Sequence, residues 1–183
     1  MNLLKEAIKK TIETYNKFAK IYADRHHAKI LQYQLNTFVS LLPGKKILDV
    51  GCGSGRDVAY FLEEGLDPIG IDLSDGLLEE AKKRVPKGNF IKMDMLKLKF
   101  EPESFDGILA LDSFLHIPKA EGKKVLENFS KILKANGAIY ICVKEGEGEA
   151  LVEEKQYEKD INPRFFAFYK QVELEELLKS VGF

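Results

Sequence analysis

The sequence predicts an α/β fold, a three-layer αβα sandwich around a mostly parallel sheet. From residue 46 onward, short apolar runs alternate with amphipathic stretches, an order that favours parallel strands joined by right-handed helical crossovers. The 183 residues are 45% hydrophobic and 31% charged, which is typical of a soluble domain that buries a core. We therefore expect a single domain, 1–183, with helices over 1–43 and an α/β core over 44–183.

The expected elements follow from periodicity and from stop signals. Apolar residues recur at helical spacing over 2–23 and 27–42, and Pro43-Gly44 ends the second of these helices. Ser74 stands at the N-cap position of a later helix, and Asn136-Gly137 supplies a left-handed turn before the last strand. The expected strands are 46–50, 68–72, 89–92, 105–111 and 137–143. The expected helices of the core are 55–65, 75–85, 119–134 and 172–181.

Composition limits the classes of function. The net charge is −1, whereas proteins that bind nucleic acid usually carry a clear basic excess, so nucleic acid is an unlikely partner. Residues 1–40 nevertheless carry seven basic and three acidic side chains, which leaves a local basic face as an alternative. The two cysteines indicate no disulfide framework, and neither a signal peptide nor a long apolar span is visible. We expect a cytoplasmic protein with no membrane partner and no metal site.

A glycine-rich turn follows the first expected strand. The run Ile47–Gly55 is an apolar strand that passes through Asp49 into alternating glycines, at Gly51, Gly53 and Gly55. Glycines at a strand-to-helix turn let the backbone approach a ligand, and the helix N-terminus behind them favours a negative group. The turn therefore predicts a nucleotide-like cofactor.

The spacing of these glycines separates two kinds of cofactor. A dinucleotide fingerprint has the spacing G-x-G-x-x-G, but here Arg56 occupies the position of the third glycine. A carboxylate at Asp49 would lie near the two phosphates of a dinucleotide, whereas it suits a cationic group such as an amino-acid ammonium. The spacing favours a cofactor with a cationic end.

Two further acids extend this interpretation. Asp72 ends the second expected strand, where a carboxylate accepts hydrogen bonds from vicinal ribose hydroxyls. Asp94 follows the third strand and is expected to accept the exocyclic amine of an adenine, with Leu73 and Met95 against the ring. An ammonium, a ribose and an adenine amine together describe S-adenosylmethionine. The alternatives are that Asp72 is a helix-leading acid and Asp94 an exposed turn residue.

Four motifs occur in order at the expected spacing: Leu48–Gly55, Gly70–Ser74, Asp94 with its neighbours, and Phe105–Ala110. On these motifs the chain resembles the class I S-adenosylmethionine-dependent methyltransferases, small microbial members among them, over residues 10–183. The resemblance implies a Rossmann-like sheet and S-adenosylmethionine as the cofactor. It implies that the glycine loop lines the methionine part and that the turn at 111–113 closes over the site. Within the loop, Cys52 is interpreted as a small packing residue and not as a nucleophile.

The N-terminal segment resembles the helical lid of the same enzymes, in which an aromatic side chain covers the cofactor. Tyr15 and Tyr22 are the candidates, and core packing on an amphipathic helix is the alternative for both. The predicted cofactor-binding residues are thus Tyr15, Tyr22, Asp49, Gly51, Cys52, Gly53, Gly55, Asp72, Leu73, Asp94, Met95 and Leu111.

The expected acceptor site lies after the fourth strand. The sequence Asp112-Ser113-Phe114-Leu115-His116 lacks the Asn/Asp-Pro-Pro-aromatic signature of enzymes that methylate adenine, cytosine or glutamine nitrogens. His116 is the candidate catalytic residue, since an imidazole takes a proton from an acceptor near neutral pH; a packed histidine is the alternative. The loop 144–149 either attracts a cationic acceptor with its carboxylates or is a solvated acidic loop.

The predicted function is transfer of a methyl group from S-adenosylmethionine to a small-molecule acceptor, leaving S-adenosylhomocysteine. One alternative is an RNA or tRNA methyltransferase that uses the basic N-terminal helices. Another is a non-catalytic protein that binds S-adenosylmethionine and serves an interface.

The end of the chain departs from the family pattern, and we expect the usual C-terminal β-hairpin to be missing. The strand 138–143 would then lie at the edge of the sheet, where an apolar strand is prone to association. We expect this edge to be covered by residues 144–170 or by a second subunit, which makes a homodimer a candidate assembly.

Overall fold

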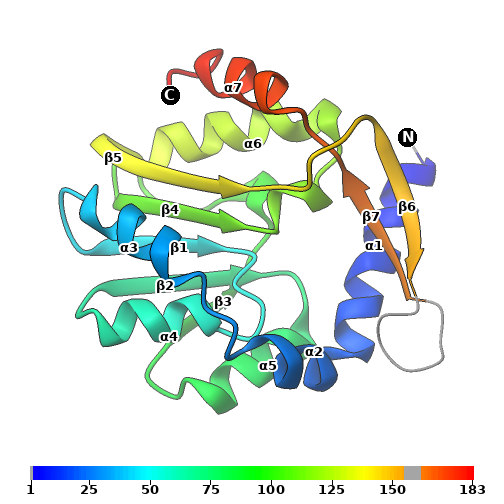
Figure 1. The fold of residues 1–183 in the computed structure, drawn as a ribbon, viewed down its shortest axis with the longest axis horizontal. Helices are drawn as coiled ribbons and strands as arrows, with labels where there is room; N and C mark the ends of the chain where they lie inside the picture. The colour runs from blue at the N-terminus through cyan, green and yellow to red at the C-terminus, as the bar shows by residue number, and fades with distance from the viewer. Residues whose placement is uncertain (1, 155–161) are drawn as a thin grey trace.

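A computed structural model describes residues 2–154 and 162–183 of the chain (Figure 1). Five parallel strands form the main sheet in the order β3-β2-β1-β4-β5. The chain runs outward from β1 to β3 and then returns to the other side of β1, so the strand order reverses between β1 and β4. These strands are β1 (Lys46–Val50), β2 (Asp67–Asp72), β3 (Asn89–Lys92), β4 (Phe105–Leu111) and β5 (Leu133–Cys142).

Helices cover both faces of this sheet, and the predicted three-layer αβα sandwich is confirmed (Figure 1). One face carries α3 (Gln32–Ser40), α4 (Arg56–Glu63) and α5 (Asp75–Arg84), and the other carries α6 (Lys119–Ile132) and α7 (Gln171–Lys179). Short 3-10 turns, η1 (Met95–Lys97) and η2 (Phe114–His116), follow β3 and β4.

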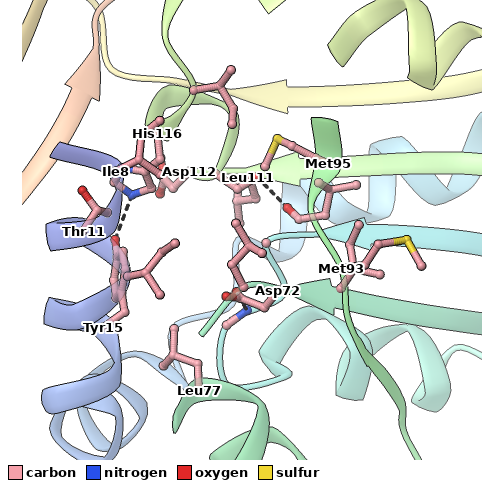
Figure 2. Close-up of a pocket in the computed structure, with 18 of the residues that line it drawn as sticks. Ile8, Thr11, Tyr15, Asp72, Leu77, Met93, Met95, Leu111, Asp112 and His116 are labelled. Atoms are coloured by element: carbon pink, nitrogen blue, oxygen red, sulfur yellow. Dashed lines mark hydrogen bonds between the residues drawn. The ribbon is translucent and has the colours of Figure 1, made fainter. Parts of the chain in front are cut away.

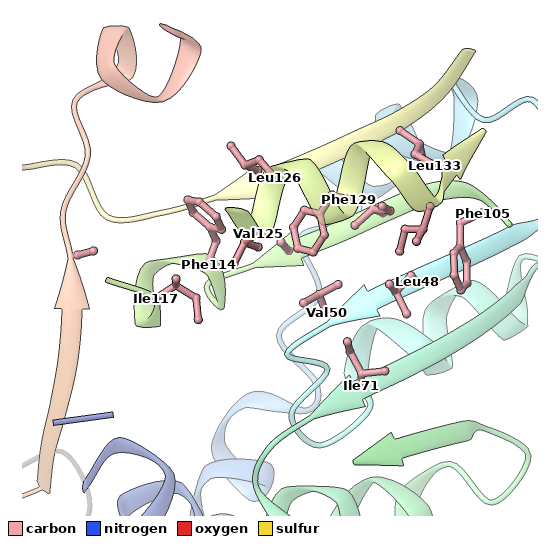
Figure 3. Close-up of a cluster of buried hydrophobic side chains, with 14 of the residues drawn as sticks. Leu48, Val50, Ile71, Phe105, Phe114, Ile117, Val125, Leu126, Phe129 and Leu133 are labelled. Carbon is pink, nitrogen blue, oxygen red and sulfur yellow. The ribbon is translucent and has the colours of Figure 1, made fainter. Parts of the chain in front are cut away.

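The alternation of side chains along β1 explains how two cores form around one strand. Ile47 packs with Phe38 and Phe61 on the side of α3 and α4. Leu48 belongs to the larger cluster on the opposite face, between the sheet and α6 (Figure 3). Because β1 is buried on both faces after Lys46, its sequence from Ile47 reads as an apolar run that Asp49 interrupts.

Helix α5 confirms a local prediction from the sequence. The hydroxyl of Ser74 accepts a hydrogen bond from the backbone N–H of Leu77 at 3.1 Å, which caps the helix as its position predicts. Asn136 also adopts the expected left-handed conformation, at φ 62°. The strand around it is longer than expected, since β5 begins at Leu133 and carries an irregularity opposite Phe105–Gly107.

The N-terminal helices differ from the prediction. The expected helix over 2–23 is divided at Phe18 (φ −109°, ψ 17°) into α1 (Asn2–Lys17) and α2 (Ala19–His26). The expected helix over 27–42 begins only at Gln32. Ile30 and Leu31 are 40% and 38% exposed, so these apolar side chains do not anchor a helix to the core, and α3 is anchored by its buried residues Leu35 and Phe38.

An antiparallel hairpin, β6 (Glu149–Glu154) and β7 (Asn162–Ala167), is present that the sequence did not predict. It lies along α1, as Figure 1 shows. Thr14 Oγ1 donates to the carbonyl of Pro163 at 2.9 Å, and the N–H of Phe165 donates to Thr11 Oγ1 at 2.8 Å.

The expectation that residues 144–170 cover the edge of the sheet is therefore wrong for their described part. The hairpin pairs with itself and packs on α1, while β5 pairs with β4 alone among the described strands. In the described residues, α7 is the last element. A second subunit at this edge stays a prediction. In the described parts of the chain, no helix is long and apolar enough to cross a membrane.

Candidate functional site

A cavity of about 110 Å³ lies at the carboxyl ends of β1, β2 and β4, beneath α1 (Figure 2). It occupies the point where the strand order reverses, which is where open α/β sheets bind ligands. Asp72 lines it from the end of β2 and Met93 from the residue after β3, and Thr11 and Tyr15 line it from α1 (Figure 2). Its other lining residues are Ile8, Ile12, Tyr22, Val50, Gly51, Gly53, Ile71, Leu73, Leu77, Met95, Leu111, Asp112, Ser113, His116 and Ile117.

The glycine loop forms one wall of this cavity. Gly51 has φ +73°, and a Cβ added to it would lie 2.3 Å from the Cβ of Ser113, so both its conformation and its neighbour require glycine. Its N–H donates to the carbonyl of Ile71 at 2.7 Å, which fastens the loop to β2. A Cβ added to Gly53 would lie 3.6 Å from the ring of Tyr22, so the lid residue Tyr22 lies directly over the loop.

Asp72 links the glycine loop to helix α5. Its carboxylate accepts hydrogen bonds from the N–H of Gly53 at 2.9 Å and from the N–H of Ser74 at 2.8 Å. Burial raises the pKa of Asp72, and the backbone N–H donors lower it. Each carboxylate oxygen retains a further lone pair, and the side chain lines the cavity. Asp72 thus lies at the cavity, and its contact with ribose hydroxyls stays a prediction.

Asp49 lies beneath the loop and is not among the lining residues. The side chain is 2% exposed, and its Oδ2 has no hydrogen-bond partner in the described residues. Burial and then the nearby Asp57 carboxylate raise the pKa of Asp49 well above its usual range. Asp57 itself pairs with Arg56 at 2.7 Å. A cationic group held at the loop would stabilise the charged form of Asp49.

The remaining predicted loop residues, Cys52 and Gly55, do not line the first cavity. Cys52 is buried and lines a small cavity behind the loop, together with His26 and Arg56. Burial raises the pKa of its thiol well above the usual value, which agrees with a packing residue. Gly55 begins α4 in a left-handed conformation, and a Cβ there would lie 2.7 Å from Phe90. Gly55 therefore shapes the loop from behind.

The residues predicted to contact adenine divide into two groups. Leu73 and Met95 line the cavity. Asp94 is not among the lining residues; its Oδ1 accepts from the N–H of Leu96 at 2.9 Å and caps η1. Hydrogen bonding from Asp94 to an adenine amine stays a prediction. Met93 also lines the cavity, and the sequence interpretation did not include it.

His116 lies at the junction of three elements. Its Nδ1 is 2.6 Å from the carbonyl oxygen of Phe165, and its Nε2 is 2.9 Å from the hydroxyl of Tyr15. Because a carbonyl only accepts, Nδ1 carries the proton and Nε2 accepts from the tyrosine (Figure 2). Burial lowers the pKa of His116 from 6.5 to about 4. At neutral pH this histidine is an uncharged acceptor that orients Tyr15.

Tyr15 is also held from the hairpin. Nη1 of Arg164, from β7, donates to the Tyr15 hydroxyl at 3.2 Å, and the ring of Tyr22 meets that of Tyr15 edge-on at 5.5 Å. The sequence interpretation did not assign Arg164 a role in the site. The packing of the hairpin on α1 brings Arg164 to the lid.

A second cavity, of about 260 Å³, adjoins the first. The two share Tyr15, Tyr22, Leu111, Asp112 and His116 as a common wall. The second cavity is further lined by His26, Arg56, Leu115, Lys144, Arg164 and Phe166. The geometry therefore places two chambers on either side of the predicted lid tyrosines and the predicted catalytic histidine.

The acidic loop after β5 does not turn its carboxylates into this cavity. Glu147 pairs with Lys170, and Glu149 accepts from the N–H of Lys119. Lys144 is the loop residue that lines the second cavity. The contacts favour the interpretation as a solvated acidic loop over the attraction of a cationic acceptor. No group of His, Cys, Asp or Glu side chains in the described residues is arranged to hold a metal ion.

Comparison with known proteins agrees with this geometry. A family model described as a methyltransferase domain matches residues 47–137. Sterol 24-C-methyltransferase of Candida albicans is 29% identical over 175 residues, which are 88% of this chain and 44% of that protein. Demethylmenaquinone methyltransferase of Renibacterium salmoninarum is 33% identical over 57% of this chain and 43% of its own length. The chain thus spans less than half the length of these relatives.

Solved structures share the fold. The 1,6-didemethyltoxoflavin-N1-methyltransferase of Burkholderia thailandensis, solved with S-adenosylhomocysteine, superposes with a TM-score of 0.72 at 22% identity, covering 97% of this chain and 77% of its own. A structure from Methanosarcina mazei described as a SAM-dependent methyltransferase gives 0.70 at 18% identity, over 81% and 82%. With the glycine loop, Asp72 and the sheet order in place, the chain belongs to the class I S-adenosylmethionine-dependent methyltransferases.

Proposed function

We propose that this chain transfers a methyl group from S-adenosylmethionine to a small-molecule acceptor and releases S-adenosylhomocysteine. The observation that carries the proposal is the pair of adjoining cavities. One contains the glycine loop and Asp72, and the other shares with it the wall formed by Tyr15, Leu111 and His116. A transfer between two molecules needs two sites that meet at a shared boundary.

The residues present fit the cofactor in three respects. The buried Oδ2 of Asp49 lacks a partner in the described structure, and the ammonium of the methionine part would balance its charge. The Asp72 carboxylate would accept the ribose hydroxyls. Leu73, Met93 and Met95 provide an apolar surface for the adenine. In this proposal Gly51 and Gly53 let the backbone approach the methionine part.

When bound, S-adenosylmethionine supplies a methyl group on a sulfonium that a nucleophile in line with the carbon–sulfur bond displaces. The chain's own contribution is to position the acceptor and to exclude water. Tyr15 and Tyr22, from α1 and α2, lie over the boundary of the two cavities. His116 holds the Tyr15 hydroxyl in place through its unprotonated Nε2. A general base is required only for an acceptor that begins protonated.

The relatives support a small acceptor. The names of the relatives specify a sterol, a demethylmenaquinone and a didemethyltoxoflavin. The second cavity has a volume of about 260 Å³. This volume is close to the lower end of the roughly 300–1,000 Å³ that is common for small-molecule sites.

The test is a transfer assay with a labelled methyl group. The protein is incubated with methyl-labelled S-adenosylmethionine and a panel of metabolites, and the label is followed into small molecules, RNA and protein. We expect label in a small-molecule product, suppressed by excess S-adenosylhomocysteine because both forms of the cofactor occupy one site. A protein that binds the cofactor and never moves the label, or that labels RNA alone, would contradict the proposal.

A further inference from the structure

We propose that His26, the last residue of α2, contacts the acceptor and takes up the proton that the acceptor loses on methylation. This inference rests on the proposed methyl transfer and specifies its acceptor as a molecule whose nucleophilic nitrogen, oxygen or sulfur bears a hydrogen. The position of His26 at two cavities, the surroundings of its ring and the contrast with His116 support the inference.

His26 lies on the acceptor side of the lid. It lines the second cavity and also the small cavity behind the glycine loop. It is not among the described residues that line the first cavity, which contains Asp72. The imidazole is therefore next to the glycine loop and outside the predicted cofactor site, as a group that meets the acceptor must be.

Tyr22 holds the imidazole in place. The two residues are four positions apart and so share one face of α2. Their rings stack with centroids 4.7 Å apart and an interplanar angle of 30°, and Tyr22 lines all three of these cavities. A stack engages the faces of the rings and leaves the nitrogens at the imidazole edge for hydrogen bonding. Within the part of the chain that the structure describes, neither ring nitrogen of His26 has a hydrogen-bond partner.

His116 differs from His26 in this respect. Nδ1 of His116 donates to the carbonyl of Phe165 at 2.6 Å, and Nε2 accepts from the hydroxyl of Tyr15 at 2.9 Å. A proton taken up at Nε2 would displace the hydrogen bond that Tyr15 donates. Of the two histidines that line the second cavity, His26 is thus the one whose lone pair no described group occupies.

The surroundings of His26 keep its ring uncharged. Burial lowers the pKa of His26 below its usual value of 6.5, and nearby cations add to this effect: Lys29, Arg56, Arg164 and Arg25. At neutral pH one ring nitrogen is therefore unprotonated and able to accept a proton.

The proposed step moves one proton. The lone pair of the acceptor atom forms the bond to the methyl carbon, and the carbon–sulfur bond breaks with its electron pair kept by sulfur. The hydrogen on the acceptor atom leaves as a proton to the unprotonated nitrogen of His26. Because this side chain is only half-buried, the proton passes from there to water. Proton transfer to a positioned side chain contributes roughly 100-fold to 10,000-fold to a rate.

Acylation by diethyl pyrocarbonate, located in the chain by mass spectrometry, tests the state of the histidines without turnover. The reagent attacks an accessible imidazole nitrogen that is unprotonated. At pH 7 we expect His26 to react faster than His116, whose two nitrogens are both engaged. A His26 that reacts no faster than His116 would overturn the inference, whichever acceptor the protein uses.

Two variants connect His26 to the reaction. With the acceptor found in the transfer assay, His26→Gly should lower the rate of transfer about 100-fold, and added imidazole should restore part of it. His27→Gly changes the neighbouring histidine, which is not among the described residues that line the three cavities, and should show neither effect. Both variants should bind S-adenosylhomocysteine as the wild type does.

Three results of these assays would contradict the role of His26. They are an unchanged rate in His26→Gly, a loss of rate that imidazole does not restore, and a loss that accompanies weaker binding of S-adenosylhomocysteine. The proposed function fails separately, if the wild type transfers no label, and the acylation experiment still tests His26 in that case.

Discussion

The positions of Gly51 and Asp72 at the cavity were predicted from the sequence because they depend on local chain geometry. A glycine at the end of one strand and an acid at the end of the next lie at the carboxyl ends of adjacent strands, whatever the rest of the chain does. Arg164 and Met93 were not predicted, since they reach the cavities only through packing between distant segments. For His116 the position was predicted, and the catalytic role stays a prediction. Its position by the cavity follows from the strand end, but its tautomer is set by Phe165 and Tyr15, far away in sequence, and burial lowers its pKa.

Gly51 and Gly65 form a matched pair for measuring the requirement for glycine in the loop. Both have φ +73°, but a Cβ at Gly51 would meet Ser113 at 2.3 Å, whereas a Cβ at Gly65 has no atom within 4 Å. Gly65→Ala should lower the free energy of unfolding by about 1–2 kcal/mol, the strain of a left-handed residue. Gly51→Ala should lower it by at least about 1 kcal/mol more, through the clash. Urea unfolding measures both. Equal losses would show that Ser113 does not constrain the loop.

His116 should make stability depend on pH. Its pKa in the folded protein is about 4, against 6.5 for the ordinary side chain, so the unfolded chain binds the proton first as pH falls. The contribution of His116 is present above pH 6.5 and is lost progressively as pH falls toward 4. At pH 5 the loss is on the order of 2 kcal/mol.

The measurement compares the wild type with His116→Gln, whose amide keeps a donor and an acceptor. The difference in unfolding free energy between the two proteins should shift in favour of the variant between pH 7.5 and pH 5. His26 and His27, whose pKa values are also lowered, contribute equally to both proteins and cancel. A difference that does not change with pH would rule out the buried, neutral histidine.

At the level of whole elements, the bounds of the core strands and helices were predicted within a few residues. The bounds of the N-terminal lid helices were not. The core strands are short apolar runs between turn signals, and each pattern contains its own boundaries. The division of the N-terminal helix at Phe18 and the hairpin β6–β7 depend on contacts between α1 and β7. These contacts join residues about 150 positions apart, which no local pattern reveals.

Asn16 joins the lid to the core, and its removal should loosen α1. Its Oδ1 accepts from Ser74 Oγ at 2.7 Å and from the N–H of Gly76 at 3.0 Å, so α1 is fixed to the start of α5 beside Asp72. We expect Asn16→Ala to lower the free energy of unfolding by about 1 kcal/mol and to speed amide hydrogen exchange in α1. Asn89→Ala, at an exposed position at the start of β3, is the control. Unchanged exchange in α1 would mean that the hairpin alone holds the lid.

For the molecule as a whole, the strand order explains why the site lies at the carboxyl ends of the central strands. The reversal between β1 and β4 opens a crevice at their carboxyl ends. The lid helices and the hairpin also line this crevice, and the strand order does not determine where they pack. The edge strand β5 was predicted to be covered by residues 144–170 or by a second subunit. In the described chain, β5 pairs only with β4. A second copy at that edge would appear as a dimer in solution by light scattering.

Binding of S-adenosylhomocysteine, followed by isothermal titration calorimetry, tests the assignment of the cofactor site most directly. The wild type should bind one molecule per chain. Asp72→Ala should weaken binding at least tenfold, as expected for the loss of a charge-assisted hydrogen bond. Asp67→Ala, which removes an exposed acid at the other end of β2, should leave the affinity unchanged. No binding at millimolar ligand, or an affinity that Asp72→Ala does not alter, would contradict the site described at the ends of β1 and β2.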